Sequence, residues 1–286
     1  MTTRRRRLGI PLVVGVLVLV GCGAAAIREP SEPSAAWDDW RAARREELVG
    51  PEGWLSLVGL FWLEPGESTI GSDPASTFVL PRGPAYLGRV VVGDEVRFVG
   101  QDHDENLVLD APLALGDLRV MLIERGGRRA LRVRDVESPA RQSFGEIPVY
   151  DYDASMRVRA HVRAPEPGRM LSLVNVLGMQ VDEPCVAILD LTLGASAITL
   201  VASDDGEGGY FVMLRDATAG EGETYGAGRY LDVPAADANG ETWVDFNRLY
   251  TPPCGYTSLA TCPLPPEENV LSIPIRAGER YTAQPH

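Results

Sequence analysis

Polar and aromatic side chains gather in the second half of the sequence and are suited to binding a ligand. The candidates are Tyr225, Arg229, Asp245, Asn247 and Tyr250. Because side chains alternate along a strand, Asp245 and Asn247 would share one face. These groups predict a site for a small polar ligand or an envelope glycan, with Tyr225 as an aromatic wall. If Arg229 meets Asp245, the pair could instead be a buried structural support, because buried charges need partners.

A carboxylate pair in the same region offers a different chemistry. Asp216 and Asp245 could act as general acid and base in a hydrolase, provided that their carboxyl groups face one cleft about 5 to 10 Å apart. A scaffold without any site is the third alternative. The sequence does not choose among binding, hydrolysis and scaffolding.

Few other groups in the sequence are able to do chemistry. All 27 basic residues are arginine, which excludes a Schiff-base lysine and a P-loop lysine. His103 lies in QDHDEN, a segment typical of an exposed hairpin tip, although its carboxylates could also bind a hard cation. The sequence lacks HExxH, the nucleophile elbow and a dinucleotide-binding GxGxxG. We therefore predict no cofactor and no metal centre, and the catalytic residues stay unknown.

Cys254 and Cys262 lie close together in NRLYTPPCGYTSLATCPLPP. An oxidising cell envelope favours a disulfide between them. Closing so short a loop would stabilise the fold by about 2–3 kcal/mol in the chain-entropy model. Two thiolates without a histidine do not make a zinc site. Cys185, at the start of a predicted strand, is interpreted as a buried structural thiol.

The N-terminus has the layout of a bacterial export signal. Four arginines precede an apolar stretch over residues 8–20, which is too short to span a bilayer comfortably. Residues 19–22, Leu-Val-Gly-Cys, resemble a lipobox, so we predict a signal peptide over residues 1–21 and lipidation of Cys22 with acyl chains such as palmitate. An ordinary secretory signal or an uncleaved anchor is the alternative.

Lipidation would make the protein an exported lipoprotein of the cell envelope. More than one acyl chain gives stable anchoring, at about 0.8 kcal/mol per buried methylene. Residues 22–36 are small, polar and proline-containing, and form the predicted tether. Gly23 after the cysteine indicates the outer membrane, if the host has one.

The charge of the chain limits its partners. The net charge is −13 and the pI is near 4.8, so the protein repels nucleic acid and anionic lipid headgroups. We therefore expect no nucleic-acid partner, and contact with the membrane only through the lipid on Cys22.

One helix and many strands must position these groups. Residues 34–50 predict a short amphipathic helix with Ser34 as its cap and Trp37, Trp40 and Leu48 as apolar anchors. Farther along, short alternating apolar runs are separated by Gly, Pro, Asp and Asn, which is typical of antiparallel strands. No later run keeps helical spacing long enough for a βαβ unit.

The predicted fold class is therefore mainly β. We expect an antiparallel sandwich-like or barrel-like architecture in two closely packed parts, with one short N-terminal helix. Residues 37–140 would hold the helix and the first β part, and residues 141–286 would hold the second part with the polar cluster. Turn formers and aromatic residues near 138–153 interrupt the strand pattern and indicate this boundary.

Three segments resemble the signature regions of the bacterial and archaeal family called domain of unknown function 1684. They are GWLSLVGLFWLEPGESTIGSDP, FVMLRDATAGEGETYGAGRYLDV and VDFNRLYTPPCGYTSLATCPLPPEENVLSIPIRAGERY. The resemblance spans about residues 37–281 and implies a fold but no agreed activity. Thr251 stands where the family typically has Asn in Tyr-Asn-Pro-Pro-Cys, and the TAGEGETY turn is one residue longer. No role that rests on that Asn side chain is carried over.

A second, weaker resemblance concerns GESTIGSDPASTFVLP, residues 66–81. This segment is similar to the opening strands of a forkhead-associated β-sandwich. Ser72 stands where phosphothreonine readers have Arg. The resemblance therefore implies a sandwich for the first β part and no phosphopeptide binding.

Overall fold

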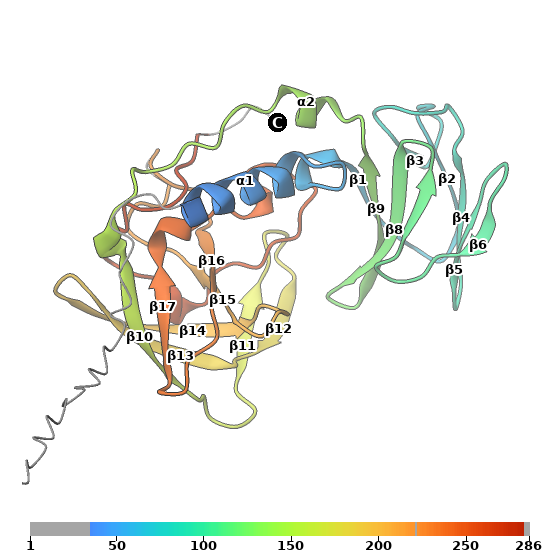
Figure 1. Ribbon diagram of the computed structural model, residues 1–286. Coiled ribbons are helices and arrows are strands. Elements are labelled where there is room, and N and C mark those ends of the chain that lie inside the picture. The colour runs from blue at the N-terminus through green and yellow to red at the C-terminus, as the bar shows by residue number, and fades with distance from the viewer. Residues whose placement is uncertain (1–34, 221, 283–286) are drawn as a thin grey trace, which may run out of the picture. The chain divides into compact units, whose positions relative to one another are not determined.

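The computed structural model describes residues 35–220 and 222–282 (Figure 1). Strands predominate and almost all of them pair antiparallel, which confirms the predicted mainly β fold class. No helix within the described ranges is long and apolar enough to cross a membrane. The predicted leader, the lipidation residue Cys22 and the helix cap Ser34 lie outside the described residues.

The predicted N-terminal helix is present as α1, Ala35–Val49. Trp37 and Leu48 are buried as expected, and Trp40 is half-buried. Arg44 falls on the same helical face as Trp37 and Leu48, since the three positions are separated by whole turns. The helix ends where the N–H of Gly50 donates to the carbonyl of Glu46 at 2.7 Å. A 3-10 turn, η1 (Trp54–Ser56), follows.

The first β part consists of two sheets that pack face to face. Their buried residues, among them Val90, Phe98, Val120 and Leu131, form one hydrophobic core. The first sheet has the order β1-β9-β8-β7: β1 (Leu57–Trp62), β9 (Arg128–Asp135), β8 (Leu118–Arg125) and β7 (Pro112–Leu115). The second has the order β3-β2-β4-β5-β6: β3 (Phe78–Val79), β2 (Gly66–Gly71), β4 (Gly88–Val92), β5 (Val96–Val99) and β6 (Asp104–Asn106).

Two details differ from the sequence-based expectations. β2 and β3 pair parallel at two positions, because residues 72–77 between them form bends and turns after which the chain runs beside β2 in the same direction. A second short helix, α2 (Pro139–Ser143), spans the predicted boundary after residue 140. The division into residues 37–140 and 141–286 stays a prediction.

The second β part is built on a six-stranded sheet that curves into a half-barrel (Figure 1). Phe246 and Leu249, which follow its last strand, are buried inside it together with Ile275 and Ala277. The strand order is β16-β15-β14-β13-β10-β17: β16 (Arg229–Val233), β15 (Tyr210–Leu214), β14 (Ser196–Asp204), β13 (Ala187–Leu193), β10 (Arg157–Arg163) and β17 (Glu241–Asp245).

Smaller elements complete this part. The backbones of Tyr230 in β16 and Tyr250 exchange two hydrogen bonds of 2.8 and 2.9 Å, so the segment after β17 returns to the opposite end of the sheet. A separate hairpin and four 3-10 turns fill the connections: β11 (Met170–Val174), β12 (Gln180–Pro184), η2 (Ala154–Met156), η3 (Phe246–Arg248), η4 (Pro253–Gly255) and η5 (Glu267–Asn269).

Asn269 replaces a missing strand contact within the half-barrel. β14 and β15 pair only at the end of β14, at Ser203 and Asp204. The fully buried amide of Asn269 fills the gap: it accepts from the N–H of Val201 at 2.9 Å and donates to the carbonyls of Val201 and Met213, both at 2.8 Å. One side chain therefore satisfies backbone groups on two diverging strands.

Replacing this amide should destabilise the fold. Asn269→Ala leaves three buried backbone groups without partners, and we expect a loss of about 2–4 kcal/mol in the free energy of unfolding, measured by urea titration. Asn239→Ala, at an exposed turn, is the matched control, with an expected change within about 0.5 kcal/mol. Equal stability of Asn269→Ala and wild type would contradict this role.

Candidate functional site

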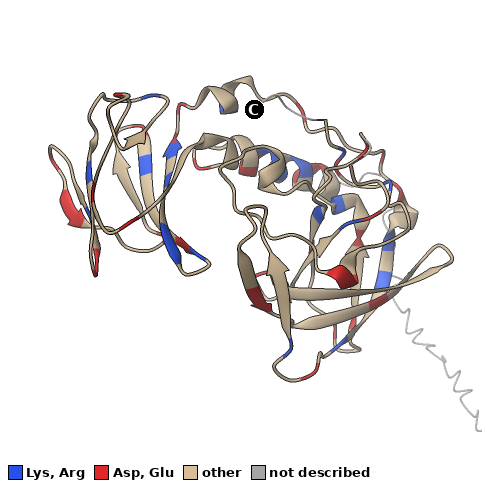
Figure 2. Ribbon diagram, turned by 180° about the vertical axis from the view of Figure 1, so that it is seen from behind, with Lys and Arg blue, Asp and Glu red and all other residues tan. Residues whose placement is uncertain are grey.

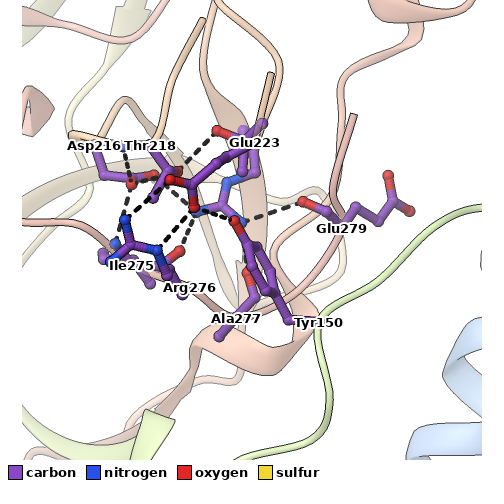
Figure 3. Close-up of polar contacts among 10 residues, drawn as sticks. Tyr150, Asp216, Thr218, Glu223, Ile275, Arg276, Ala277 and Glu279 are labelled. Carbon is purple, nitrogen blue, oxygen red and sulfur yellow. Dashed lines mark hydrogen bonds and ion pairs between the residues drawn. The ribbon is translucent and has the colours of Figure 1, made fainter. Parts of the chain in front are cut away.

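Arg229 and Asp216 form a buried ion pair in the second β part, and Figure 3 shows Asp216 among its neighbouring polar groups. Arg229 opens β16 and is fully buried, and its Nη2 lies 2.7 Å from Oδ2 of Asp216. The guanidinium also donates to the backbone carbonyls of Ile275, Ala277 and Glu279. One arginine therefore joins the β15–β16 hairpin to the C-terminal segment 275–279.

The chain satisfies both oxygens of Asp216. Oδ1 accepts from the backbone N–H of Thr218 at 2.9 Å, from its hydroxyl at 2.7 Å and from the N–H of Ile275 at 3.0 Å. Burial alone would raise the pKa of Asp216, but Arg229 and the bond from Thr218 outweigh burial and hold the pKa below its usual range. Asp216 is thus an ionised structural group at neutral pH.

A glycine shapes the entry to β16. Gly228 has φ +100°, in the region that L side chains rarely adopt, and a Cβ there would lie 2.6 Å from the carbonyl oxygen of Leu214. The backbone can therefore pass close to β15 just before Arg229, which pairs with Leu214 in the sheet. This register brings Arg229 next to the end of β15, where Asp216 follows.

A second buried arginine, Arg44, attaches α1 to the same C-terminal segment. Its Nε lies 2.9 Å from Oε1 of Glu279, and its guanidinium stacks 4.6 Å from the ring centre of Tyr250. The other oxygen of Glu279 accepts from the N–H of Thr251 at 2.7 Å and from the hydroxyl of Tyr256 at 3.1 Å. Burial would lower the pKa of Arg44, but the carboxylate of Glu279 outweighs it and the pKa is raised.

A cavity of about 250 Å³ lies beside α1, and we call it the α1 cavity. It is bounded by α1 on one side and by Glu146, Ile147 and Val149 on the other. The buried pair of Arg44 and Glu279 belongs to its wall. Its remaining lining from α1 is Asp38, Trp40, Arg41, Ala42 and Arg45.

Two of its arginines are available to a ligand. Arg41 and Arg45 form no ion pair with any other residue in the described ranges, although the guanidinium of Arg41 lies 4.9 Å from the ring centre of Trp37. Figure 2 shows basic and acidic positions side by side along α1. The α1 cavity therefore combines guanidinium groups that are unpaired among the described residues with the exposed carboxylates of Asp38 and Glu146.

The residues that the sequence suggested as one site do not meet in one cavity. Arg229 pairs with Asp216 and not with Asp245, because β17, which ends at Asp245, lies at the other end of the sheet from β16. Asp245 accepts from the backbone N–H of Asn247 at 3.1 Å and lies 3.7 Å from Arg248. The strand alternation ends at this position, since η3 begins immediately after it.

The other suggested residues have local partners. The buried amide of Asn247 exchanges hydrogen bonds of 2.8 and 2.9 Å with the backbone of Asp153. Tyr250 lies under Arg44. Tyr225 is half-buried, donates to the carbonyl of Cys254 at 3.1 Å and packs edge-on against Tyr281 with ring centres 4.9 Å apart. None of these three side chains lines the α1 cavity.

The structure does not show the suggested carboxylate pair in one cleft, nor the predicted disulfide. Both oxygens of Asp216 are engaged by the chain, and neither Asp216 nor Asp245 lines the α1 cavity. Cys254 and Cys262 are free thiols in the structure, so the predicted disulfide is not present in it. The two cysteines do lie in contact, with the N–H of Cys254 3.2 Å from the sulfur of Cys262.

Comparison with known proteins identifies the second β part. Residues 142–280 match the model of the family described as protein of unknown function, DUF1684. This part of the chain belongs to the DUF1684 family. A solution structure of an uncharacterised protein of Haloarcula marismortui is 32% identical to the chain, with a TM-score of 0.41; the match covers 49% of this chain and 78% of the other. A comparison with curated proteins gave no match.

The DUF1684 match is narrower than the resemblance over residues 37–281. It contains Asp216, Arg229 and Glu279, and both cysteines of the C-terminal loop. It leaves out α1, and so it covers only one side of the α1 cavity. Thr251, which replaces the typical Asn of the family, contacts Glu279 and Arg44 through its backbone. Those two bonds do not depend on the side chain at this position.

Sequence reasoning missed two sets of residues. Arg44 was detectable in principle, because its helical spacing from Trp37 and Leu48 places it on the buried face of α1. The pairing within the second set gave no signal in the sequence. In this set, the carboxylate of Glu223 accepts from the hydroxyl of Tyr150 at 2.8 Å. It also forms a bidentate ion pair with Arg276, with N–O distances of 2.8 and 2.9 Å (Figure 3).

The Arg229–Asp216 pair generates a test. Asp216→Asn leaves a buried guanidinium without its counter-charge, and we expect a loss of about 3–5 kcal/mol in the free energy of unfolding at pH 7. Because folding lowers the pKa of Asp216, this difference from wild type should be complete above the ordinary Asp pKa of about 3.9. It should disappear as the pH falls through the lower pKa of the folded state.

Urea titration between pH 2 and 8 measures the difference. Asp151→Asn, at an exposed position, is the control and should change the free energy little at any pH. The double variant Asp216→Leu/Arg229→Met should be less destabilised than Asp216→Asn, since it removes both charges. A loss for Asp216→Asn that is independent of pH would contradict the ionised pair.

Proposed function

We propose that this protein is a lipid-anchored protein of the cell envelope that binds a small polar ligand in the α1 cavity. The proposal rests on one observation: some of the arginines that line the cavity have a carboxylate partner within the protein and others do not. Arg44 is held by Glu279, whereas Arg41 and Arg45 have no carboxylate partner among the described residues. In a chain with a net charge of −13, such arginines are suited to an anionic group of a ligand.

The lining of the cavity narrows the ligand class. Its volume of about 250 Å³ lies below the roughly 300–1,000 Å³ of pockets for drug-sized molecules. Asp38 and Glu146 can accept hydrogen bonds from hydroxyl groups, and Trp40 offers an aromatic surface. A sugar acid, which carries a carboxylate and several hydroxyls, combines these features, and it agrees with the sequence-based expectation of a polar ligand or envelope glycan.

Thermal unfolding in the presence of glucuronic acid tests the binding site. A ligand that binds only the folded state stabilises it by about 2.7 kcal/mol at 100 times its dissociation constant. We expect glucuronic acid to raise the melting temperature, and glucose, which lacks the carboxylate, to have a smaller effect. Arg41→Ala/Arg45→Ala should weaken binding about 10-fold or more, since a charge-assisted hydrogen bond contributes about 1.5–3 kcal/mol.

Arg89→Ala is the matched control, because Arg89 pairs with Glu67 on the first β part and does not line the α1 cavity. It should bind like wild type. The proposed site would be contradicted if glucose and glucuronic acid raised the melting temperature equally. It would also be contradicted if glucuronic acid raised the melting temperature of the double arginine variant as much as that of wild type.

Metabolic labelling with palmitate tests the anchor separately. In a bacterial host the full chain should incorporate label and sediment with membranes, and Cys22→Ser should do neither, because the thiol of Cys22 is the predicted acceptor. Cys185→Ser should be labelled like wild type, since Cys185 is buried in the core of the second β part. Labelled Cys22→Ser protein would refute lipidation at this residue and would leave the ligand experiment unaffected.

A further inference from the structure

Cys254 and Cys262 lie against each other at the two ends of a short loop. The backbone N–H of Cys254 donates to the sulfur of Cys262 at 3.2 Å. Cys262 is only 6% exposed, whereas Cys254 is half-buried. The two cysteines are therefore in contact in the folded protein and belong to one hydrophobic cluster.

The surroundings of Cys262 favour its anion. The backbone N–H of Cys254 donates to its sulfur, and the hydroxyl of Tyr230 donates next to it, to the carbonyl of Pro263 at 2.6 Å. The neighbouring Cys254 side chain is the largest cause of a lowered pKa at Cys262, and Cys262 in turn raises the pKa of Cys254. Cys262 thus loses its proton first, while Cys254 keeps one.

Arg132 of β9 supplies an independent observation. Its side chain is 6% exposed and packs 5.4 Å from the ring centre of Trp54, and its Nε has no hydrogen-bond partner among the described residues. Burial, followed by repulsion from Arg125 and Arg134, lowers the pKa of Arg132 to about 10. The charge of Arg132 also lowers the pKa of Cys262. A buried cation with an open donor favours an anion nearby, and the charges of Asp110 and of a Cys262 thiolate both raise the pKa of Arg132.

We propose that Cys254 and Cys262 form a redox-active dithiol in which Cys262 attacks a small peroxide and Cys254 resolves the product to a disulfide. The oxidant has to be small because Cys262 is nearly buried. This dithiol is separate from the α1 cavity, which neither cysteine lines.

The reaction has two balanced steps. The Cys262 thiolate attacks one oxygen of hydrogen peroxide; an S–O bond forms, the O–O bond breaks, and the departing hydroxide takes up a proton to become water. The Cys254 sulfur then loses its proton and attacks the sulfur of the Cys262 sulfenic acid, so an S–S bond forms, the S–O bond breaks and a second water leaves. The two thiols lose two electrons, and the peroxide is reduced to two waters. A dithiol reductant reverses the change by thiol–disulfide exchange.

Peptide mapping by mass spectrometry tests the dithiol in the full chain. The protein is reduced, freed of reductant, treated with hydrogen peroxide and digested without reduction. We expect one cross-link, between the peptides of Cys254 and Cys262, and its removal by dithiothreitol. In Cys254→Ser, Cys262 should be trapped as a sulfenic acid by dimedone, whereas in Cys262→Ser, Cys254 should stay a thiol.

Cys185→Ser is the matched control, because Cys185 is also buried but donates to the carbonyl of Ala187. It should form the same cross-link as wild type. The wild-type protein alone is enough to test the proposal. If Cys254 and Cys262 both remain unmodified thiols after peroxide treatment, the proposal is overturned. Sulfenic acid on Cys254 in Cys262→Ser, with none on Cys262 in Cys254→Ser, would overturn the assignment of the attacking sulfur.

Arg132 is a positioning residue for this chemistry, and its charge can be tested. In the Cys254→Ser background, Arg132→Gln should slow alkylation of Cys262 by iodoacetamide at pH 7 about tenfold, which corresponds to one pKa unit. Arg132→Lys should restore most of the rate, because it keeps the charge. The same rate in all three proteins, with unchanged circular dichroism, would remove Arg132 from the mechanism.

Discussion

Arg229 has to be neutralised inside the half-barrel, and much of the second β part follows from that requirement. A buried guanidinium is costly unless every donor group finds a partner. Asp216 supplies the charge, and three backbone carbonyls of the segment 275–279 supply most of the remaining acceptors. Gly228 allows the chain to approach β15 closely enough for this arrangement. The arginine therefore selects both the hairpin geometry and the path of the C-terminal segment.

The C-terminal segment serves a second arginine at the same time. While the backbone carbonyl of Glu279 faces Arg229, its carboxylate holds Arg44 of α1. Glu279 also fixes Thr251 and Tyr256, next to the loop that carries the two cysteines. The wall of the α1 cavity and the start of the cysteine loop thus depend on one buried carboxylate.

Local patterns were enough to predict much of the fold. The amphipathic spacing around Trp37 and Leu48 identified α1, and alternating apolar runs identified the strands. The partner of Arg229 was not predictable in this way, because Asp216 and Asp245 are equally suitable carboxylates by type. The choice depends on strand order: Arg229 pairs with Leu214 of β15, just before Asp216, whereas Asp245 pairs with Arg157 of β10. Local sequence carries little information on such pairing between distant strands.

The position of the acceptors of Arg229 has a consequence for the order of folding during synthesis. Ile275, Ala277 and Glu279 leave the ribosome about 50 positions after Arg229. Until they emerge, β16 carries a guanidinium whose Nη donors cannot all be satisfied on burial, so the half-barrel has to wait for segment 275–279. The first β part draws its core only from residues before 134 and has no such dependence. The two parts therefore become able to fold at different times on a growing polypeptide.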